Sequence, residues 1–138
     1  MVVYERGMTP PRVLLIDRSQ LSANMFRLLL SPLSVELIAV CRFEEGRPFF
    51  FRHPAPAVAL INSNSFGKKF SQYLNDFCDD ETIARTPKIF LCKETAGEER
   101  WREILAGVSQ GRVVVRPFDP AHMRDELAAC LKRRGGQE

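Results

Sequence analysis

The sequence predicts an α/β fold: a three-layer, doubly wound sheet of five parallel strands with helices on both faces. Three observations predict it. Five short apolar runs recur along the chain, segments with helical spacing of apolar residues alternate with them, and proline or glycine residues lie at many of the boundaries. Strands buried on both faces of a parallel sheet are continuous apolar runs, and the intervening helices supply the crossover connections that such a sheet needs.

Each predicted strand is a short apolar run, and two of them end in a polar residue. Asp17 closes the first run and Asn62 closes the third, while Pro56 and Pro87 lie just before the third and fourth. The predicted strands are residues 12–17, 35–40, 57–62, 88–92 and 112–115.

Apolar residues at helical spacing predict helices between these strands. The first covers residues 19–30, with Ser19 as its N-cap and a buried stripe of Leu21, Met25, Leu28 and Leu29. Residues 45–52 form the weakest helix, because Gly46 and Pro48 interrupt it. A helix from residue 68 has an inward face of Phe70, Tyr73, Leu74 and Phe77. The next helix opens with a capping box at Thr95 and Glu98, and its inward face is Trp101, Ile104, Leu105 and Val108. The last helix covers residues 121–133 and turns Met123, Leu127, Cys130 and Leu131 inward.

The whole chain has the size and balance of one globular domain. It has 138 residues, a net charge of +3 and 45% hydrophobic residues. We expect a flexible leader over residues 1–11, a domain over residues 12–133 and a polar tail or linker over residues 134–138. The basic residues are dispersed, which argues against a dedicated nucleic-acid surface.

The cysteines and the apolar runs restrict the setting of the protein. The four cysteines form no CxxC pair, so no zinc or redox site is indicated, and Cys92 and Cys130 are expected in the core. No apolar run could cross a bilayer, and no secretory signal is recognised. A reducing cytoplasm is the expected location.

The residues that end the strands define the candidate site, because ligands of open α/β sheets bind beyond the carboxyl ends of the strands. The residues at or just beyond these ends are Asp17, Arg18, Asn62, Cys92 and Arg116.

These residues and the order of the elements resemble a response-regulator receiver domain over residues 12–133. Residues 56–62 resemble the family's third strand, and Arg116-Pro117-Phe118 resembles its Lys-Pro-Phe step. The resemblance implies a flavodoxin-like receiver topology. It also implies a pair of acids that hold Mg²⁺ at Asp17-Arg18, a phosphoacceptor aspartate at Asn62, a hydroxyl at Cys92 and a lysine at Arg116.

The departures from this pattern are concentrated at the chemistry. Asn62 has an amide where the family has a nucleophilic carboxylate, and an amide cannot form the usual acyl phosphate. Arg18 puts a cation where an acid would help to hold Mg²⁺. Cys92 replaces the hydroxyl, and Val113 is small where the family often has an aromatic residue. We therefore expect a degenerate phosphorylation pocket with no catalytic residue, metal or cofactor, and a protein that is not an enzyme.

The expected function is a phosphorylation-independent pseudo-receiver, a signalling or scaffolding module that binds a protein partner or its own copy. By resemblance, the interaction face is the predicted helix that opens at Thr95, with Glu98, Glu99, Arg102 and Glu103, together with the fifth strand and the last helix. Two alternatives stay open. Arg18, Lys93 and Arg116 could bind a small anion at the former pocket, or the chain could be a nucleic-acid-binding regulatory module. Arg18 itself either pairs with Asp17 or faces solvent.

Overall fold

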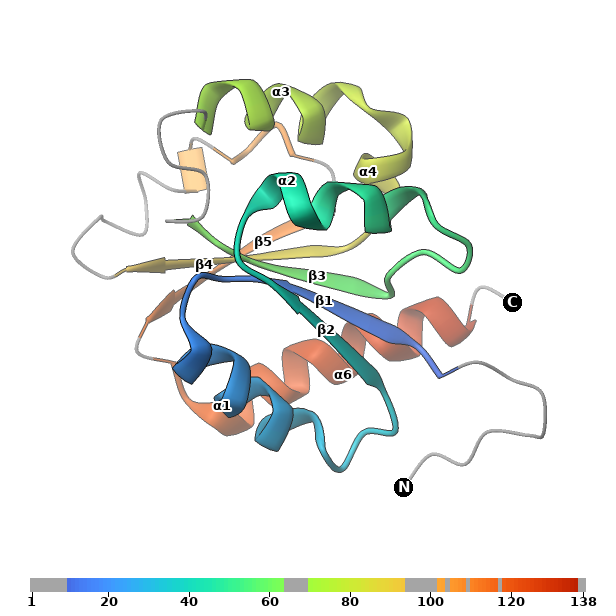
Figure 1. Cartoon of the computed structure of the whole chain (residues 1–138), viewed down its shortest axis with the longest axis vertical. Coiled ribbons are helices and arrows are strands. Elements are labelled where there is room, and N and C mark those ends of the chain that lie inside the picture. Colours follow the sequence, from blue (N-terminus) through green and yellow to red (C-terminus); the bar gives the residue numbers. More distant parts are fainter. Residues whose placement is uncertain are drawn as a thin grey trace.

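The computed structural model contains one parallel sheet and confirms the predicted fold class (Figure 1). It describes residues 10–63, 70–93, 102–103, 105–108, 110–116 and 118–136. The strands run in the order β2-β1-β3-β4-β5, and every neighbouring pair is parallel. They are β1 (Arg12–Ile16), β2 (Glu36–Val40), β3 (Val58–Asn62), β4 (Lys88–Lys93) and β5 (Gly111–Arg116).

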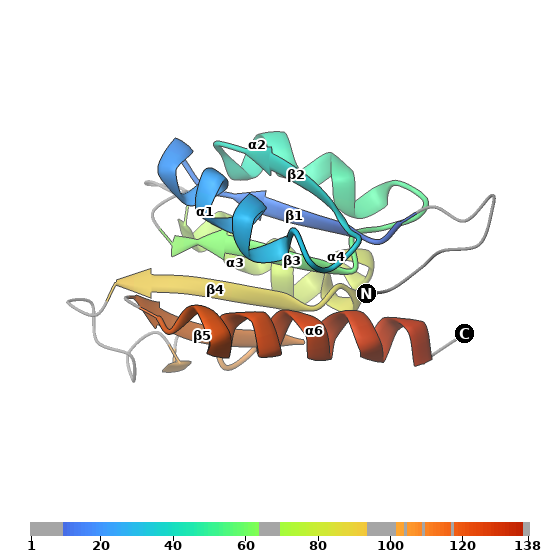
Figure 2. The same cartoon turned by 90° about the horizontal axis from the view of Figure 1, so that it is seen from below.

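Helices cover both faces of the sheet and bury a separate apolar cluster on each (Figures 1 and 2). One face carries α1 (Gln20–Leu30) and α6 (Pro120–Gly136), which pack Phe26, Met123 and Leu127 against it. The other face carries α2 (Phe43–Gly46), the 3₁₀ segment η1 (Arg47–Phe51), α3 (Phe70–Asp79) and α4 (Glu81–Arg85). Among the described residues, no helix is long and apolar enough to span a membrane.

Helix α1 begins as predicted but buries only part of the predicted stripe. The Ser19 side chain accepts a hydrogen bond from the Ser22 N–H, which confirms the N-cap. Leu21 and Leu28 were expected in the core, and instead they are 79% and 76% exposed. The buried residues are Ser22, Ala23, Phe26, Leu29 and Leu30. Leu29 is buried as predicted and Met25 packs against the core, so the prediction was wrong for Leu21 and Leu28 only. Two adjacent faces of this helix have apolar residues at helical spacing, and packing of Phe26 selects one of them.

The segment predicted as a weak helix over residues 45–52 splits into two short elements. Helix α2 ends at Gly46, and η1 continues the chain with Pro48 in its first turn. Gly46 packs tightly on β1, since a Cβ atom there would lie 2.8 Å from Ile16 Cδ1. A glycine is therefore needed where α2 crosses the sheet.

Two further helices differ from the prediction. Helix α4 was not predicted; Asp80 caps it by accepting hydrogen bonds from Thr82 N–H and Ile83 N–H. Helix α6 begins at Pro120 and extends through Gly136, past the predicted end at residue 133. Thr95, Glu98, Trp101 and Ile104 lie outside the described residues, whereas Leu105 and Val108 are buried as predicted.

Candidate functional site

Asp17 directly follows β1 and is the buried acid of the candidate site. Its side chain is 1% exposed. One carboxylate oxygen, Oδ1, accepts a hydrogen bond from the Ser19 N–H at 2.9 Å, and Oδ2 accepts one from Arg116 Nη2, also at 2.9 Å. Ser19 in turn caps α1. A single carboxylate therefore joins the end of β1, the start of α1 and the end of β5.

Arg116 reaches Asp17 from the far edge of the sheet. It is the last residue of β5, and β3 and β4 lie between β5 and β1 in the strand order. Its side chain is 27% exposed, and its buried Nε atom has no hydrogen-bond partner in the part of the chain that the structure describes. A guanidinium keeps its charge at every physiological pH, so it is a permanent counterion for the Asp17 carboxylate.

The other candidate residues lie at the same end of the sheet as Asp17, where the strands have their carboxyl ends. Asn62, which is half-buried, ends β3, and Cys92 is buried near the end of β4. Burial raises the pKa of the Cys92 thiol to about 11, although a hydrogen bond with Ser63 acts in the opposite direction. Val113 is half-buried on β5. A thiol that stays protonated at neutral pH is a poor nucleophile, so Cys92 is a core residue in this arrangement.

Arg18, which follows Asp17 in the sequence, does not pair with the Asp17 carboxylate. Arg18 is exposed, and the cation that contacts Asp17 is Arg116. Lys93 ends β4 in register with Arg116, but its side chain is not described. Of the expected interaction face, Arg102 and Glu103 are exposed, and Glu98 and Glu99 lie outside the described residues.

The residues described at this site do not supply the donor set that Mg²⁺ requires. This hard cation prefers several oxygen anions arranged around it. Asp17 already has Arg116 as a counterion, Asn62 offers a neutral amide, and Arg18 is a second cation. Within the described ranges, no group of three or more His, Cys, Asp or Glu side chains could hold a metal ion.

Lys88 is a buried cation that sequence reasoning missed. It begins β4, at the opposite end of the sheet from Asp17, and is 1% exposed. Its Nζ atom donates to the carbonyl oxygens of Ile83, Ala84 and Thr86 at 2.8, 3.3 and 2.6 Å. Burial lowers its pKa from 10.5 to about 8, and the neighbouring Cys78 acts in the opposite direction. Lys88 thus caps the C-terminal end of α4.

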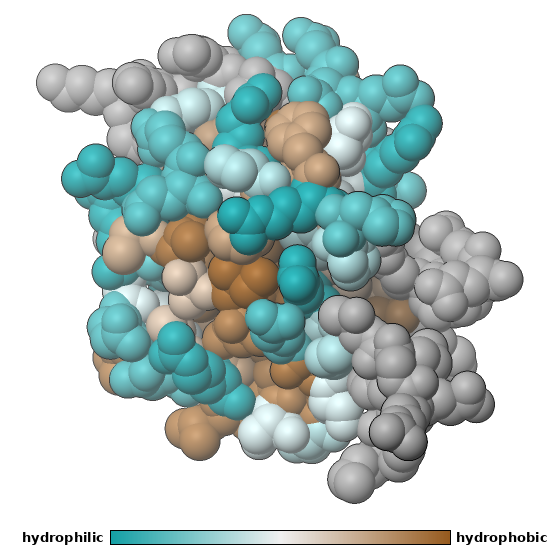
Figure 3. All heavy atoms as spheres, turned by 45° about the vertical axis from the view of Figure 1, so that its right-hand side comes forward, coloured by the Kyte–Doolittle hydropathy of each residue, from teal (hydrophilic) through white to brown (hydrophobic). Residues whose placement is uncertain are grey.

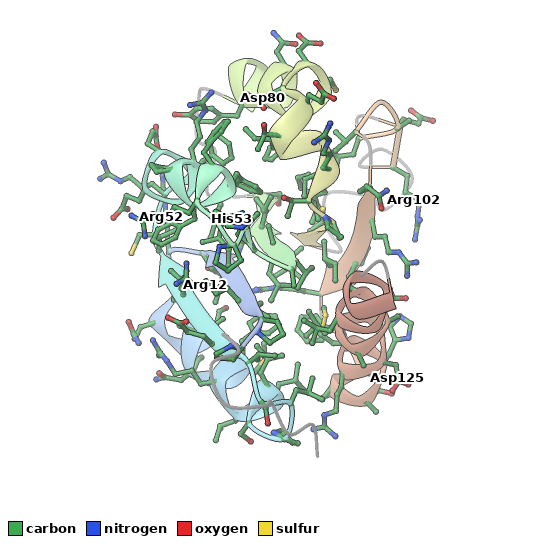
Figure 4. All side chains as sticks on the ribbon, turned by 90° about the vertical axis from the view of Figure 1, so that its right-hand side faces the viewer. Arg12, Arg52, His53, Asp80, Arg102 and Asp125 are labelled. Carbon is green, nitrogen blue, oxygen red and sulfur yellow. The ribbon has the colours of Figure 1, made fainter. Side chains whose placement is uncertain are left out.

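A groove lies beside β5, between α6 and the residues that precede the strand. Its volume is about 480 Å³. We call it the β5 groove; its lining includes Leu105, Val108, Arg112, Val113, His122 and Glu126. Arg112 pairs with Glu126 across it. Figure 4 shows Arg102 on one side of β5 and α6 on the other.

Comparison with known proteins identifies the fold. No protein-family model matches the sequence, and no curated protein matches it. Many solved structures are similar to this chain. A signal receiver domain described for a LuxO repressor protein of Vibrio parahaemolyticus has a TM-score of 0.76 and 15% identity, over 94% of this chain and 95% of that one.

The second is the signal receiver domain of an HD domain-containing protein from Pseudomonas fluorescens Pf-5, with a TM-score of 0.74 and 14% identity over 99% and 96% of the two chains. The third is the chemotaxis response regulator CheY4 of Vibrio cholerae, with a TM-score of 0.71 and 20% identity over 89% and 100%. The chain therefore has the fold of a response-regulator receiver domain.

Proposed function

We propose that this chain is a pseudo-receiver, a signalling or scaffolding module that binds another protein without being phosphorylated. The observation that carries the proposal is the ion pair between Arg116 and the buried Asp17 carboxylate, 2.9 Å long. The similarity to receiver domains supports a role in signal transduction, and the residues at the strand ends suggest which chemistry has been lost.

The chemical argument concerns charge and nucleophilicity. The Asn62 amide is neutral and cannot accept a phosphoryl group as a carboxylate does. Two unit charges about 4 Å apart interact by about 4 kcal/mol at an effective dielectric near 20, so the Arg116 cation strongly opposes Mg²⁺ beside Asp17. The pair holds β1, α1 and β5 together without a ligand. In this proposal the protein is not an enzyme and presents one constitutive surface.

The β5 groove supports protein binding at the face expected from the sequence. Leu105, Val108 and Val113 contribute apolar lining, and the Arg112–Glu126 pair and His122 contribute polar lining. Protein interfaces combine apolar contact area with polar groups that form hydrogen bonds. A partner that fits would pack an apolar side chain against Val113 and make polar contacts to Arg112 and Glu126.

The proposal is tested by an amide-shift NMR titration with millimolar Mg²⁺, followed by beryllofluoride, which mimics an acyl phosphate. We expect the amides of Asp17, Asn62 and Arg116 to stay unshifted. The matched control is a variant with Arg18→Asp, Asn62→Asp and Arg116→Lys together, which restores the acids and the lysine and should respond. Shifts of the natural chain at these residues would contradict a constitutive module.

A photo-crosslinking residue tests the partner face in cells of the source organism. Placed at Val113, in the β5 groove, it should give a discrete protein adduct. Placed at Arg124, which is exposed on α6 outside that groove, it should give none. Equal adducts from both positions would count against the groove as the binding face.

The buried Nε atom of Arg116 favours one second candidate, a sensor of a small anion. This N–H has no hydrogen-bond partner among the described residues, and a buried donor without one is uncommon. Inorganic phosphate added alone in the same titration separates the two functions. Shifts confined to the surroundings of Arg116 would support the sensor.

A further inference from the structure

The edge strand β2 has an unusual surface. It is the first strand in the sheet order, and β1 is its only neighbour among the described strands, so its other side ends the sheet (Figures 1 and 2). A sheet edge presents unpaired N–H and C=O groups that can pair with another strand.

The contacts with β1 show which groups of β2 point outward. Glu36 N–H donates to the Pro11 carbonyl, and the Val40 carbonyl accepts from Asp17 N–H, so residues 36 and 40 face β1. The direction alternates along a strand, so the backbone groups of Leu37 and Ala39 point away from the sheet. No hydrogen bond joins these outward groups to another described residue.

The side chains of this edge do not protect it. Natural sheets protect exposed edges with lysine, proline or a bulge, and β2 (sequence ELIAV) has none of these. Ala39 is exposed, and Leu37, Ile38 and Val40 are half-buried. The apolar area at mid-height in Figure 3 lies over this edge of the molecule. The one charged residue, Glu36, is paired with Arg12 at 3.4 Å.

We propose that β2 is a dimerisation edge, and that its occupant is β2 of a second copy of this chain, running antiparallel. Pairing about a two-fold axis at Ile38 places Leu37 opposite Ala39 of the partner subunit. Both residues have outward backbone groups, so each such pair exchanges its two hydrogen bonds.

The same register suits the side chains. Ile38 lies opposite Ile38 of the partner subunit, and Glu36 lies opposite Val40 of the partner subunit. Apolar cross-strand pairs stabilise a sheet, and no like charges face each other. Because Glu36 is already paired with Arg12 within its own chain, a second copy meets no unpaired charge on this strand. The edge is self-complementary, as a two-fold interface requires.

The expected dimer is weak. A stable interface buries roughly 1,200–2,000 Å², and a strand of five residues offers only part of that. Dimerisation should therefore depend on concentration over the micromolar range. It leaves the β5 groove free, because β5 is at the opposite edge of the sheet.

Sedimentation equilibrium over micromolar to millimolar concentrations tests the proposal, together with amide hydrogen exchange. We expect a monomer–dimer equilibrium that Ala39→Pro weakens about tenfold or more, because proline removes one outward donor. Ala39→Lys provides a second test, should proline disturb the fold. Asn75→Lys, a matched charge at an exposed position of α3, should leave the equilibrium unchanged.

Hydrogen exchange identifies the strand that forms the dimer interface, which the molecular mass alone does not. The Ile38 and Val40 amides face β1 and should be protected at all concentrations. Those of Leu37 and Ala39 should become protected only as the concentration rises. A monomer throughout the range overturns the proposal, and so does a dimer that both Ala39 variants leave intact, which would place self-association on another face.

Discussion

Replacing Asp17 by asparagine tests the central ion pair most directly. The change leaves an oxygen that can still accept the Ser19 N–H, but it removes the charge that Arg116 contacts. Removing one partner of a fully buried pair costs about 3–5 kcal/mol. Arg116 is 27% exposed and can turn partly to water, so we expect a loss of about 2 kcal/mol here. The melting temperature should fall by about 6–10 °C for a domain of this size.

The assay is urea unfolding followed by far-UV circular dichroism, as a double-mutant cycle. The cycle combines Asp17→Asn with Arg116→Met, and we expect a coupling energy above about 1 kcal/mol. The control is Glu36→Gln, which breaks the more exposed pair with Arg12 and should cost less than about 0.5 kcal/mol. A coupling energy near zero would refute the reasoning. So would a gain in stability of the natural chain in millimolar Mg²⁺, since the carboxylate would then be available to a metal.

Three further predictions follow from buried groups. Lys88 has a pKa of about 8 in the folded chain and 10.5 in the unfolded one, so the unfolded chain binds more protons between these values. The free energy of unfolding should therefore rise with pH in that window, by at most about 1.4 kcal/mol per pH unit. Urea unfolding at pH 7.5 and 9.5 measures this rise, and Lys88→Met should abolish it. A free energy of unfolding of the natural chain that falls between these pH values would contradict the prediction. A maleimide should label the exposed Cys41 quickly and leave the buried Cys92 unlabelled until urea unfolds the chain, as read by mass spectrometry. Phe26→Ala should cost about 3–5 kcal/mol in urea unfolding, whereas Leu28→Glu should cost less than about 0.5 kcal/mol, and the reverse order would restore the stripe predicted from the sequence.

The sheet could be predicted from the sequence because each strand is a continuous apolar run. Such a run can be buried on both faces of the strand, so the local composition is sufficient to predict the strand. The inner face of α1 could not be predicted in the same way. Leu21 and Leu28 have the same spacing as Ser22 and Leu29, and only the fit against the sheet distinguishes the two stripes.

The candidate site was predictable as a set of positions but not as a set of contacts. Strand ends of a parallel sheet meet at one edge, so Asp17, Asn62 and Arg116 could be grouped in advance. The sequence left two alternatives for Arg18, a pair with Asp17 or a position facing solvent, and Arg18 is exposed. The contact with Asp17 is made by Arg116, 99 residues away, and a pairing across that separation depends on the packed sheet.

Helix α4 and Lys88 were missed for a different reason. A helix of five residues has too few turns to show a periodic pattern. The available signal was Asp80, a strong N-cap residue directly before it. Lysine is rarely fully buried, so its position at the start of an apolar strand gave no indication that its amine would bind three carbonyl oxygens.

The two edges of the sheet differ in a way that limits how large an assembly can grow. The β5 edge borders the groove in which Arg112 pairs with Glu126 of α6, so a strand added to β5 would have to displace this pair. At the β2 edge the Glu36–Arg12 pair joins β2 to β1 and leaves the outward backbone groups of Leu37 and Ala39 open. A sheet in which both edges can pair with another strand can add subunits without end and form fibres. A sheet in which one edge can pair stops at a dimer. The ion pair beside β5 thus protects the protein against polymerisation, and replacing Arg112 and Glu126 by apolar residues would remove that protection.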